Sequence, residues 1–218
     1  MPRRFDLIVF DWDGTLLDSA AAIVLAIQSA CRDLGVTAPD DAGARQVIGL
    51  GLVDALATAV PALPPARYRE LAERYRYHYL SRDHDLALFD GTAELVEELH
   101  SRGHTLAIAT GKSRLGLARA LAHSGLGRWF HATRCADECH SKPHPQMLLE
   151  LMEALAAEPG RTLMIGDTTH DLHMARNAGV AAVAVGFGAH PAELLQAEYP
   201  VALAGSTAEL AHWLRLNG

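Results

Sequence analysis

The feature that most constrains this chain is a short apolar run that leads directly into two aspartates placed two residues apart. Leu7 to Phe10 contains no polar residue, and such a run is typical of a strand covered on both faces in a parallel sheet. On an extended backbone the side chains of Asp11 and Asp13 share one face, and Gly14 permits a sharp turn after them. Two adjacent carboxylates repel each other unless a cation or a shared proton relieves the repulsion. The segment therefore predicts a strand that ends in a charged site.

The residues around these two acids make the segment more specific. An isolated Asp-x-Asp-Gly sequence more often forms a turn, because Asp and Gly are common turn residues. The complete string Asp11-Trp-Asp-Gly-Thr15, however, resembles the first motif of the haloacid dehalogenase superfamily. The phosphatases of that superfamily use the first aspartate as a nucleophile and the second as an acid and base. The resemblance therefore implies that Asp11 attacks phosphorus and that Asp13 carries protons.

The chain divides into an α/β part and a helical part. Residues 19–84 show helical patterns and no convincing strand, with breaks at Gly49-Leu50-Gly51 and at several prolines. From there on, short apolar runs alternate with helical segments, which is the pattern of a parallel sheet with helical crossovers. We therefore predict an α/β fold with a Rossmann-like three-layer parallel-sheet core, residues 1–18 and 85–218, and an inserted all-helical cap domain, residues 19–84. Ser19 is expected to lie at the first hinge and to cap the helix that follows.

The strand ends of the predicted core collect polar residues. The predicted helices of the core span 91–100, 114–123, 145–157, 172–178 and 207–216, and the later strands span 104–109, 131–135, 162–165 and 181–185, with a last strand near residue 201. In an open α/β sheet, ligands bind beyond the carboxyl ends of the strands. The polar residues found there are Asp11, Asp13, Thr110, Gly111, Lys112, Lys142, Asp167 and Asp171. Together they match all four motifs of the superfamily, and they supply what metal-assisted phosphoryl transfer requires.

Two parts of this set are predicted to bind the phosphoryl group. Thr110 offers a hydroxyl, and the backbone amides of Gly111 and Lys112 lie at a strand-to-helix junction, where they favour an anion. Lys142 precedes Pro143, so its side chain is expected on a fixed loop. Because a lysine there can hold the transferring oxygens as a point charge, we predict that Lys142 serves both catalysis and phosphate binding.

A hard divalent cation is expected beside the nucleophile, because it cancels the repulsion between a carboxylate and a phosphate dianion. Asp11 and Asp167 are the predicted side-chain ligands of Mg²⁺. The family resemblance implies that the backbone carbonyl of Asp13 is a further ligand. Asp171 lies four residues after Asp167 and is expected either to reach the metal through water or to orient Lys142.

The resemblance extends over essentially the whole chain and points to the phosphoglycolate phosphatase-like branch. It implies a Mg²⁺-dependent phosphoric monoester hydrolase that acts on a small phosphorylated metabolite, phosphoglycolate-like or a sugar phosphate, through an aspartyl-phosphate intermediate. Specificity is expected to lie in the cap, because the core motifs handle only the phosphoryl group. Gly49, Leu50 and Gly51 resemble the family's substrate loop, and Arg45 is a candidate contact to the leaving group. The identity of the substrate does not follow from the sequence.

Two other functions fit parts of the pattern. A phosphomutase of the beta-phosphoglucomutase type would pass the aspartyl phosphate to a sugar hydroxyl rather than to water. Thr15 favours the phosphatase, because mutases of this family often carry Val at that position. A phospho-accepting receiver domain also uses strand-end acids, a Thr and a Lys, but its acceptor aspartate lies on a later strand and it has no helical insertion.

Composition bears on partners and location. The formal net charge of −7 and the lack of a basic run predict no nucleic-acid partner. The longest apolar run, residues 20–27, is too short to span a bilayer, and Asp11 interrupts the apolar stretch that follows Arg3 and Arg4. We therefore predict a cytoplasmic protein that binds a small phosphorylated substrate and no membrane. The sequence leaves its oligomeric state, monomer or dimer, open.

The three cysteines do not make a disulfide framework. Cys135 and Cys139 lie near His131, His140 and His144, but their spacing matches no standard zinc pattern. We expect reduced structural thiols and histidines that mostly serve packing or the surface.

Overall fold

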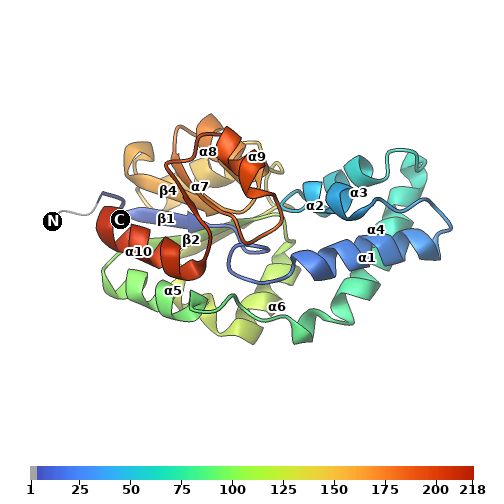
Figure 1. Ribbon diagram of the computed structural model, residues 1–218, viewed down its shortest axis with the longest axis horizontal. Coiled ribbons are helices and arrows are strands. Elements are labelled where there is room, and N and C mark those ends of the chain that lie inside the picture. The colour runs from blue at the N-terminus through green and yellow to red at the C-terminus, as the bar shows by residue number, and fades with distance from the viewer. Residues whose placement is uncertain (1–3) are drawn as a thin grey trace.

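The computed structural model describes residues 4–218, so the first three residues of the predicted 1–18 segment, Arg3 among them, lie outside the described residues. The described chain forms an α/β fold around a six-stranded parallel sheet with the strand order β3-β2-β1-β4-β5-β6 (Figure 1). The strands are β1 (Leu7–Phe10), β2 (Thr105–Thr110), β3 (Ala132–Cys135), β4 (Thr162–Gly166), β5 (Ala181–Val185) and β6 (Ala202–Ala204). The predicted parallel-sheet core is confirmed.

Strand β1 lies in the middle of the sheet and pairs in parallel with β2 on one side and with β4 on the other. Phe10, the last residue of β1, is level with Ile108 of β2 and Ile165 of β4. Because parallel strands end at the same edge of a sheet, the residues that follow these three strands meet there. This register places Asp11 beside the carboxyl ends of both neighbouring strands.

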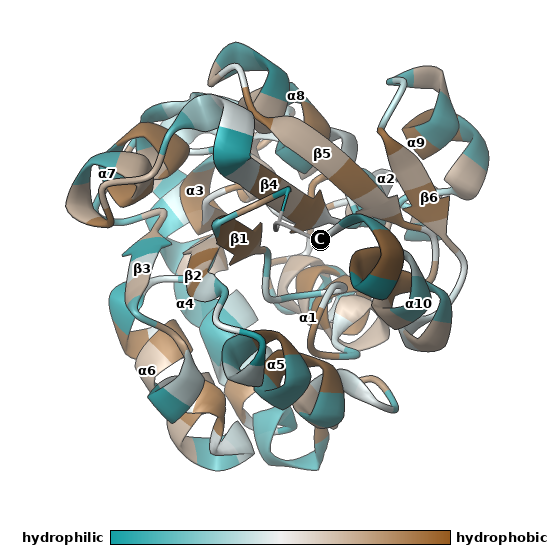
Figure 2. Cartoon of the chain, turned by 90° about the vertical axis from the view of Figure 1, so that its left-hand side faces the viewer, coloured by the Kyte–Doolittle hydropathy of each residue, from teal (hydrophilic) through white to brown (hydrophobic). Residues whose placement is uncertain are grey.

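Helices cover both faces of the sheet, which explains why β1 is apolar throughout. Ile8 and Phe10 point into one apolar core, and Leu7 and Val9 point into the other; all four side chains are fully buried. The first face is covered by α5 (Thr92–Ser101), α6 (Arg114–Ser124) and α10 (Thr207–Asn217), and the second by α7 (Gln146–Ala154), α8 (Thr169–Asn177) and α9 (Ala192–Ala197). Figure 2 shows the apolar strands β1, β4 and β5 enclosed between these two layers.

Four helices are inserted between β1 and α5: α1 (Ala20–Asp33), α2 (Asp41–Gln46), α3 (Leu52–Ala59) and α4 (Tyr68–Leu80). They enclose an apolar core of their own, to which Ile23, Ile27, Leu56 and Leu71 belong. Figure 1 shows this group beyond the carboxyl edge of the sheet, with α1 running from the sheet toward the far end of the group. The predicted inserted helical region is therefore confirmed, and we call it the cap below.

Several predicted boundaries in the core are corrected. Helix α8 begins three residues before the predicted position 172, because the Thr168 and Asp171 side chains form a reciprocal capping box at its start. Helix α7 ends at Ala154 rather than at 157, ahead of Ala156, which has a left-handed φ of 50°. Helix α9 has no predicted counterpart. Short 3₁₀ helices span Pro65–Arg67, Asp83–Asp85, Leu126–Trp129 and Pro159–Arg161.

The longest helix of the described chain, α1, has 14 residues. A helix needs about 20 apolar residues to cross a bilayer. Within residues 4–218, no helix combines the length and the apolar character that a membrane span requires.

Candidate active site

Three aspartates from separate parts of the chain meet at the carboxyl edge of the sheet. Asp11 follows β1, Asp167 follows β4, and Asp171 lies in the first turn of α8. One carboxylate oxygen from each lies within 4.8 Å of the others, and all three side chains are buried. The structure therefore brings together the predicted nucleophile and the acids predicted to hold or to support a metal.

Lys142 bridges two of these acids from the loop before α7. Its Nζ lies 2.9 Å from Asp11 Oδ1 and 2.6 Å from Asp171 Oδ1, and its side chain is entirely buried. Burial alone lowers the pKa of a lysine, but the two carboxylates outweigh it and raise the pKa of Lys142 above its ordinary value. Lys142 is therefore a permanent positive charge beside the predicted nucleophile.

Asp11 has one occupied and one open carboxylate oxygen. Oδ1 accepts a hydrogen bond from the backbone amide of Trp12 at 2.6 Å and pairs with Lys142. Oδ2 is buried and has no hydrogen-bond partner among the described residues. Burial raises the pKa of Asp11 well above its ordinary value, against the lowering effect of Lys142. Because buried polar atoms are nearly always paired in folded proteins, this open oxygen marks the position where a ligand would complete the site.

Asp167 is held by neighbours on both sides. Its Oδ1 accepts a hydrogen bond from the Thr15 hydroxyl at 2.8 Å, and its Oδ2 accepts one from the Ala189 backbone amide at 2.8 Å. Gly14, at a φ of 79°, packs so closely that a Cβ there would overlap the Asp167 carboxylate. Burial raises the pKa of Asp167 to about 7. Thr15 and Gly14 of the first motif thus fix an acid that lies 152 residues away from Thr15 in sequence.

Asp171 is already occupied by contacts within the protein. Its Oδ1 accepts a hydrogen bond from Lys142, and its Oδ2 accepts hydrogen bonds from the backbone amide and the hydroxyl of Thr168 at 3.1 and 2.7 Å. These contacts cap α8 and hold Lys142 in place. Of the two roles left open by the sequence, orientation of Lys142 is the one for which the structure provides contacts.

The donor set fits a hard divalent cation. Carboxylate oxygens are the protein ligands that Mg²⁺ prefers, and here three carboxylates converge, two of them paired with Lys142. Among the residues from 4 to 218, the acids, histidines and cysteines close enough to share a metal are these three aspartates. The cysteines are free thiols, and Cys139 contacts Glu150 at 3.6 Å rather than a histidine.

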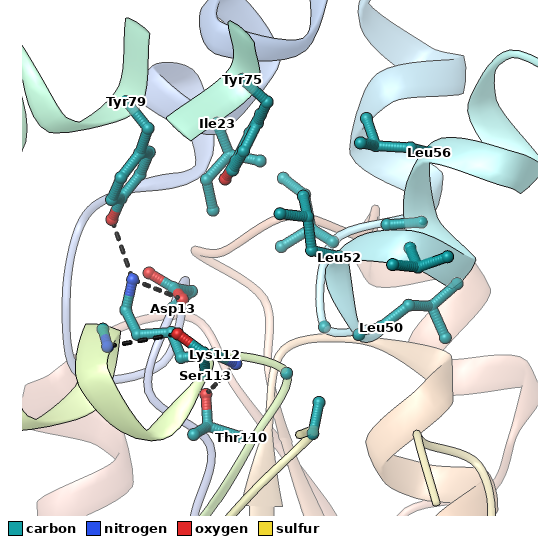
Figure 3. Close-up of a pocket in the computed structure, with 18 of the residues that line it drawn as sticks. Asp13, Ile23, Leu50, Leu52, Leu56, Tyr75, Tyr79, Thr110, Lys112 and Ser113 are labelled. Atoms are coloured by element: carbon teal, nitrogen blue, oxygen red, sulfur yellow. Dashed lines mark hydrogen bonds and ion pairs between the residues drawn. The ribbon is translucent and has the colours of Figure 1, made fainter. Parts of the chain in front are cut away.

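Asp13 lies in a separate chain of polar contacts that the sequence did not indicate. Its Oδ1 accepts a hydrogen bond from the Ser19 hydroxyl at 2.6 Å. The prediction that Ser19 caps α1 is therefore wrong, because its side chain holds Asp13 and makes no cap hydrogen bond. Its Oδ2 pairs with Lys112 Nζ at 3.0 Å. Lys112 Nζ also donates a hydrogen bond to the hydroxyl of Tyr79, on α4 of the cap, at 2.9 Å (Figure 3). The predicted proton carrier is thus linked through Lys112 to a cap residue.

The predicted phosphate loop lies at the end of β2, beside this chain of contacts. Thr110 is buried, and its Oγ1 accepts a hydrogen bond from the Lys112 backbone amide at 3.2 Å. Lys112 therefore faces Asp13 through its side chain and Thr110 through its amide. Ser113 caps α6 by accepting a hydrogen bond from the Gly116 amide at 3.3 Å. The loop thus stands at a helix N-terminus, as the anion-binding prediction requires.

The cap touches the core through the segment between α2 and α3. The Gly51 amide donates a hydrogen bond to the Ser141 hydroxyl at 2.8 Å, and the Gln46 carbonyl lies 2.8 Å from His170 Nε2. Gly49 and Leu50 stand with their carbonyls against Gly111 of the phosphate loop. Gly49, Leu50 and Gly51 therefore lie over the site, as expected of a substrate loop.

Arg45, the other predicted substrate contact, extends toward the core instead. Its Nη1 donates a weak hydrogen bond of 3.5 Å to the carbonyl of Gly188. Gly188 packs against Asp167 and Gly14. The described contact of Arg45 therefore joins the cap to the loop that follows β5, where Gly188 lies.

A methyl group at Gly111 is expected to push the cap loop off the site. The Cβ of Gly111→Ala would lie 2.5 Å from the Leu50 carbonyl and 2.6 Å from the Gly49 carbonyl, and neither backbone atom can yield as a side chain would. Because misplacement by about 1 Å costs about 100-fold in rate, kcat/KM for a phosphate ester should fall by about that factor. The matched control is Gly160→Ala, whose Cβ meets nothing within 4 Å. Equal kcat/KM values for the two variants would show that the loop does not approach Gly111 during turnover.

Known proteins are similar to this chain in both sequence and fold. Residues 8–185 match the family described as haloacid dehalogenase-like hydrolase. The probable phosphatase IndB of Dickeya dadantii is 38% identical, over 94% of this chain and 91% of the relative. A 5'-nucleotidase of Pseudomonas aeruginosa is 34% identical, over 90% of each chain. A phosphoglycolate phosphatase of Vibrio vulnificus is 31% identical, over 95% of each chain.

The agreement includes the inserted cap. The solved structure of a haloacid dehalogenase-like family hydrolase from Streptococcus pneumoniae matches with a TM-score of 0.83 at 26% identity, over 96% of this chain and 98% of that one. Coverage of nearly the whole chain means that the sheet and the inserted helices are both reproduced.

Proposed function

The chain belongs to the haloacid dehalogenase-like hydrolase family, as one of its phosphatases, and on that premise we propose that it is a Mg²⁺-dependent enzyme that hydrolyses a small phosphorylated metabolite through an aspartyl phosphate on Asp11. The observation that carries this proposal is the open Oδ2 of Asp11, buried beside Lys142 and Asp167. A carboxylate oxygen that is held still and unpaired is prepared to form a new bond.

Asp11 and Asp13 divide the chemistry between them. In the first step Asp11 Oδ2 forms a bond to phosphorus, the bond from phosphorus to the leaving oxygen breaks, and Asp13 gives that oxygen its proton. In the second step Asp13 takes a proton from water as the water oxygen bonds to phosphorus, and Asp11 departs as a carboxylate. The hydrogen bond from Ser19 orients Asp13, and the ion pair with Lys112 favours its carboxylate form, which accepts the proton in the second step.

The remaining residues hold the phosphoryl group and its counter-charge. Asp11, Asp167 and the backbone carbonyl of Asp13 would hold Mg²⁺, which when bound offsets the negative charge of phosphate and carboxylate. Lys142 Nζ, 2.9 Å from Asp11 Oδ1, donates to a phosphoryl oxygen at the same place. Thr110 and the Gly111 amide bind the other oxygens at the N-terminus of α6.

We also propose that the chain divides into two domains at the predicted boundaries. Residues 1–18 and 85–218 make the core, and residues 19–84 make a cap that closes on it. Support comes from the separate apolar core of α1 to α4. Cap closure excludes water during the first step and must relax to admit water for the second.

Phosphate release separates hydrolysis from group transfer to a sugar. The enzyme is incubated with Mg²⁺ and glucose 1-phosphate, and both free phosphate and isomerised sugar phosphate are measured. We expect phosphate from this or another ester of the panel described below, without isomerisation. Isomerised product without free phosphate would establish the phosphomutase alternative. Membership of this phosphatase family leaves the receiver-domain alternative without support.

The relatives do not fix the substrate, because one is named for nucleotides and another for phosphoglycolate. The sequence predicts a phosphoglycolate-like compound or a sugar phosphate, and a cytoplasmic location. What distinguishes these substrates is the leaving group, which must lie on the cap side of the site.

A further inference from the structure

A cavity of about 390 Å³ lies between the phosphate loop and the cap. Asp11, Asp13 and Thr110 line its core end, where the phosphoryl group would bind. Pockets of this size accept organic molecules considerably larger than glycolate. The opposite end of the cavity, which the cap forms, would hold the leaving group. The side chains that line this cap end therefore indicate which leaving groups can bind.

The cap end is lined by apolar and aromatic side chains. They come from three helices and the substrate loop and are labelled in Figure 3: Ile23, Leu50, Leu52, Leu56, Tyr75 and Tyr79. The rings of Tyr75 and Tyr79 are stacked, with centroids 5.8 Å apart and an interplanar angle of 17°. Burial raises the pKa of both phenols above the ordinary value, so both stay neutral. This wall offers apolar contact and two hydroxyl groups, but no charge.

The charged residues of the cavity are either exposed or already paired. Arg76, Arg119, Asp54 and Asp137 line it from positions exposed to solvent. Lys112, which is partly buried, pairs with Asp13 at 3.0 Å and donates to Tyr79 on the cap wall. A leaving group that carries a carboxylate would find no free cation among the buried residues of the cap wall, and burying such a charge unpaired is costly.

The apolar surface continues to the mouth of the cavity. Val53 on α3 and Leu115 on α6 line it as well, and they are 61% and 69% exposed. Exposed large apolar residues beside a cavity suit a ligand that covers them. The Tyr75 hydroxyl makes no hydrogen bond to another of the described residues, and it can therefore serve a polar group on that ligand.

We propose that the leaving group is an uncharged alcohol with an apolar or aromatic body, bound against Leu52, Leu56 and the Tyr75–Tyr79 pair. This inference rests on the proposed phosphatase function and narrows its substrate class. It predicts a lower kcat/KM for 2-phosphoglycolate and free sugar phosphates than for phosphate esters of larger, less polar alcohols. A nucleoside, with its flat base and uncharged sugar, belongs to the favoured class.

A panel of alkyl phosphates tests this proposal without a bias from leaving-group acidity. With Mg²⁺ present, kcat/KM is measured for 2-phenylethyl phosphate, ribose 5-phosphate and 2-phosphoglycolate, and a nucleoside 5'-monophosphate is added as a polar aromatic member. We expect 2-phenylethyl phosphate to exceed 2-phosphoglycolate by about 100-fold, the scale of discrimination that an apolar pocket provides. Equal or higher kcat/KM for 2-phosphoglycolate would overturn the proposal and leave the phosphatase function standing. No phosphate from any ester would contradict the phosphatase function and this inference together.

A matched pair of variants locates the preference in the cap wall. Leu52→Gln should lower kcat/KM for 2-phenylethyl phosphate by about tenfold and change that for 2-phosphoglycolate little. Leu149→Gln alters a leucine that is 47% exposed on α7 and should change neither value. An equal loss on both substrates in Leu52→Gln, with an unchanged melting temperature, would contradict a contact with the leaving group. Competitive inhibition by 2-phenylethanol in the wild type supports the contact without any variant, and its absence up to the solubility limit of the alcohol would count against it.

Discussion

Replacing Asp11 with asparagine is expected to reduce turnover of any phosphate ester by about 10⁴-fold or more, the scale of loss when a nucleophile is removed. The amide cannot donate an electron pair to phosphorus as the open Oδ2 does. Steady-state phosphate release with Mg²⁺ measures the effect. Asp11→Ala, which cannot revert by deamidation, should show the same loss.

The stability of these variants separates chemistry from folding. Asp11→Asn removes one of the two buried carboxylates that pair with Lys142, and the pair between Lys142 and Asp171 at 2.6 Å remains. The melting temperature in metal-free buffer should therefore be no lower than that of the wild type. Asp90→Asn, an exposed acid outside the site, is the control and should retain both activity and stability. Activity of Asp11→Asn or Asp11→Ala within about tenfold of wild type would contradict the assignment of the nucleophile.

Replacing Lys142 with methionine is expected to cost both activity and stability. Two buried acids, Asp11 and Asp171, would then lack their shared cation, and breaking a buried ion pair by removing one partner costs about 3–5 kcal/mol. For a chain of this length that loss lowers the melting temperature by roughly 6–20 °C. Phosphate release should fall as well, because the transferring oxygens lose a fixed positive charge. Thermal unfolding in metal-free buffer and steady-state kinetics with Mg²⁺ measure the two effects.

A second substitution tests whether the cost comes from the unpaired acids. Asp11→Asn added to Lys142→Met should restore part of the lost melting temperature, because residues in one buried ion-pair network are coupled. Arg215→Met, which removes a cation paired with Glu98 at 2.6 Å on the surface, is the contrasting control and should change stability little. A Lys142→Met protein as stable as the wild type would show that the buried acids do not depend on this lysine.

The sheet and the acids at its edge could be predicted from the sequence because their signals are local. The unbroken apolar run at residues 7–10 indicates a strand buried on both faces, and parallel strands collect whatever follows them at one edge. Asp11, Lys142 and Asp167 were expected together for that reason. In the structure these residues lie together at that edge, with Lys142 Nζ 2.9 Å from Asp11 Oδ1.

The contacts that orient these residues could not be predicted in the same way, because they join distant segments. The hydrogen bond between Lys112 and Tyr79 spans 33 residues, and the one between Thr15 and Asp167 spans 152. The Tyr, Arg and Glu content of residues 68–80 indicates only a partly exposed helix. Tyr75 and Tyr79, four residues apart, share one helix face, and that spacing is the signal that could have identified them.

The helix boundaries depend on side-chain hydrogen bonds that form only in the folded site. The Thr168-x-x-Asp171 spacing is typical of a helix start, but the position of Asp171 after a strand end also fits a metal site. In the structure Asp171 caps α8 and also holds Lys142. Ser19 shows the reverse case, because a residue expected to cap a helix holds Asp13 instead.

The aspartyl phosphate on Asp11 is the central claim, and trapping it is the most direct test. In Asp13→Asn the second step lacks its base, whereas para-nitrophenol leaves in the first step without an acid. Mixing this variant with para-nitrophenyl phosphate and Mg²⁺, quenching in acid and sequencing the peptides by mass spectrometry should reveal one phosphoryl group, carried by Asp11. Release of para-nitrophenol over many turnovers with no phosphoryl group on Asp11, or with the group on another residue, would contradict the account.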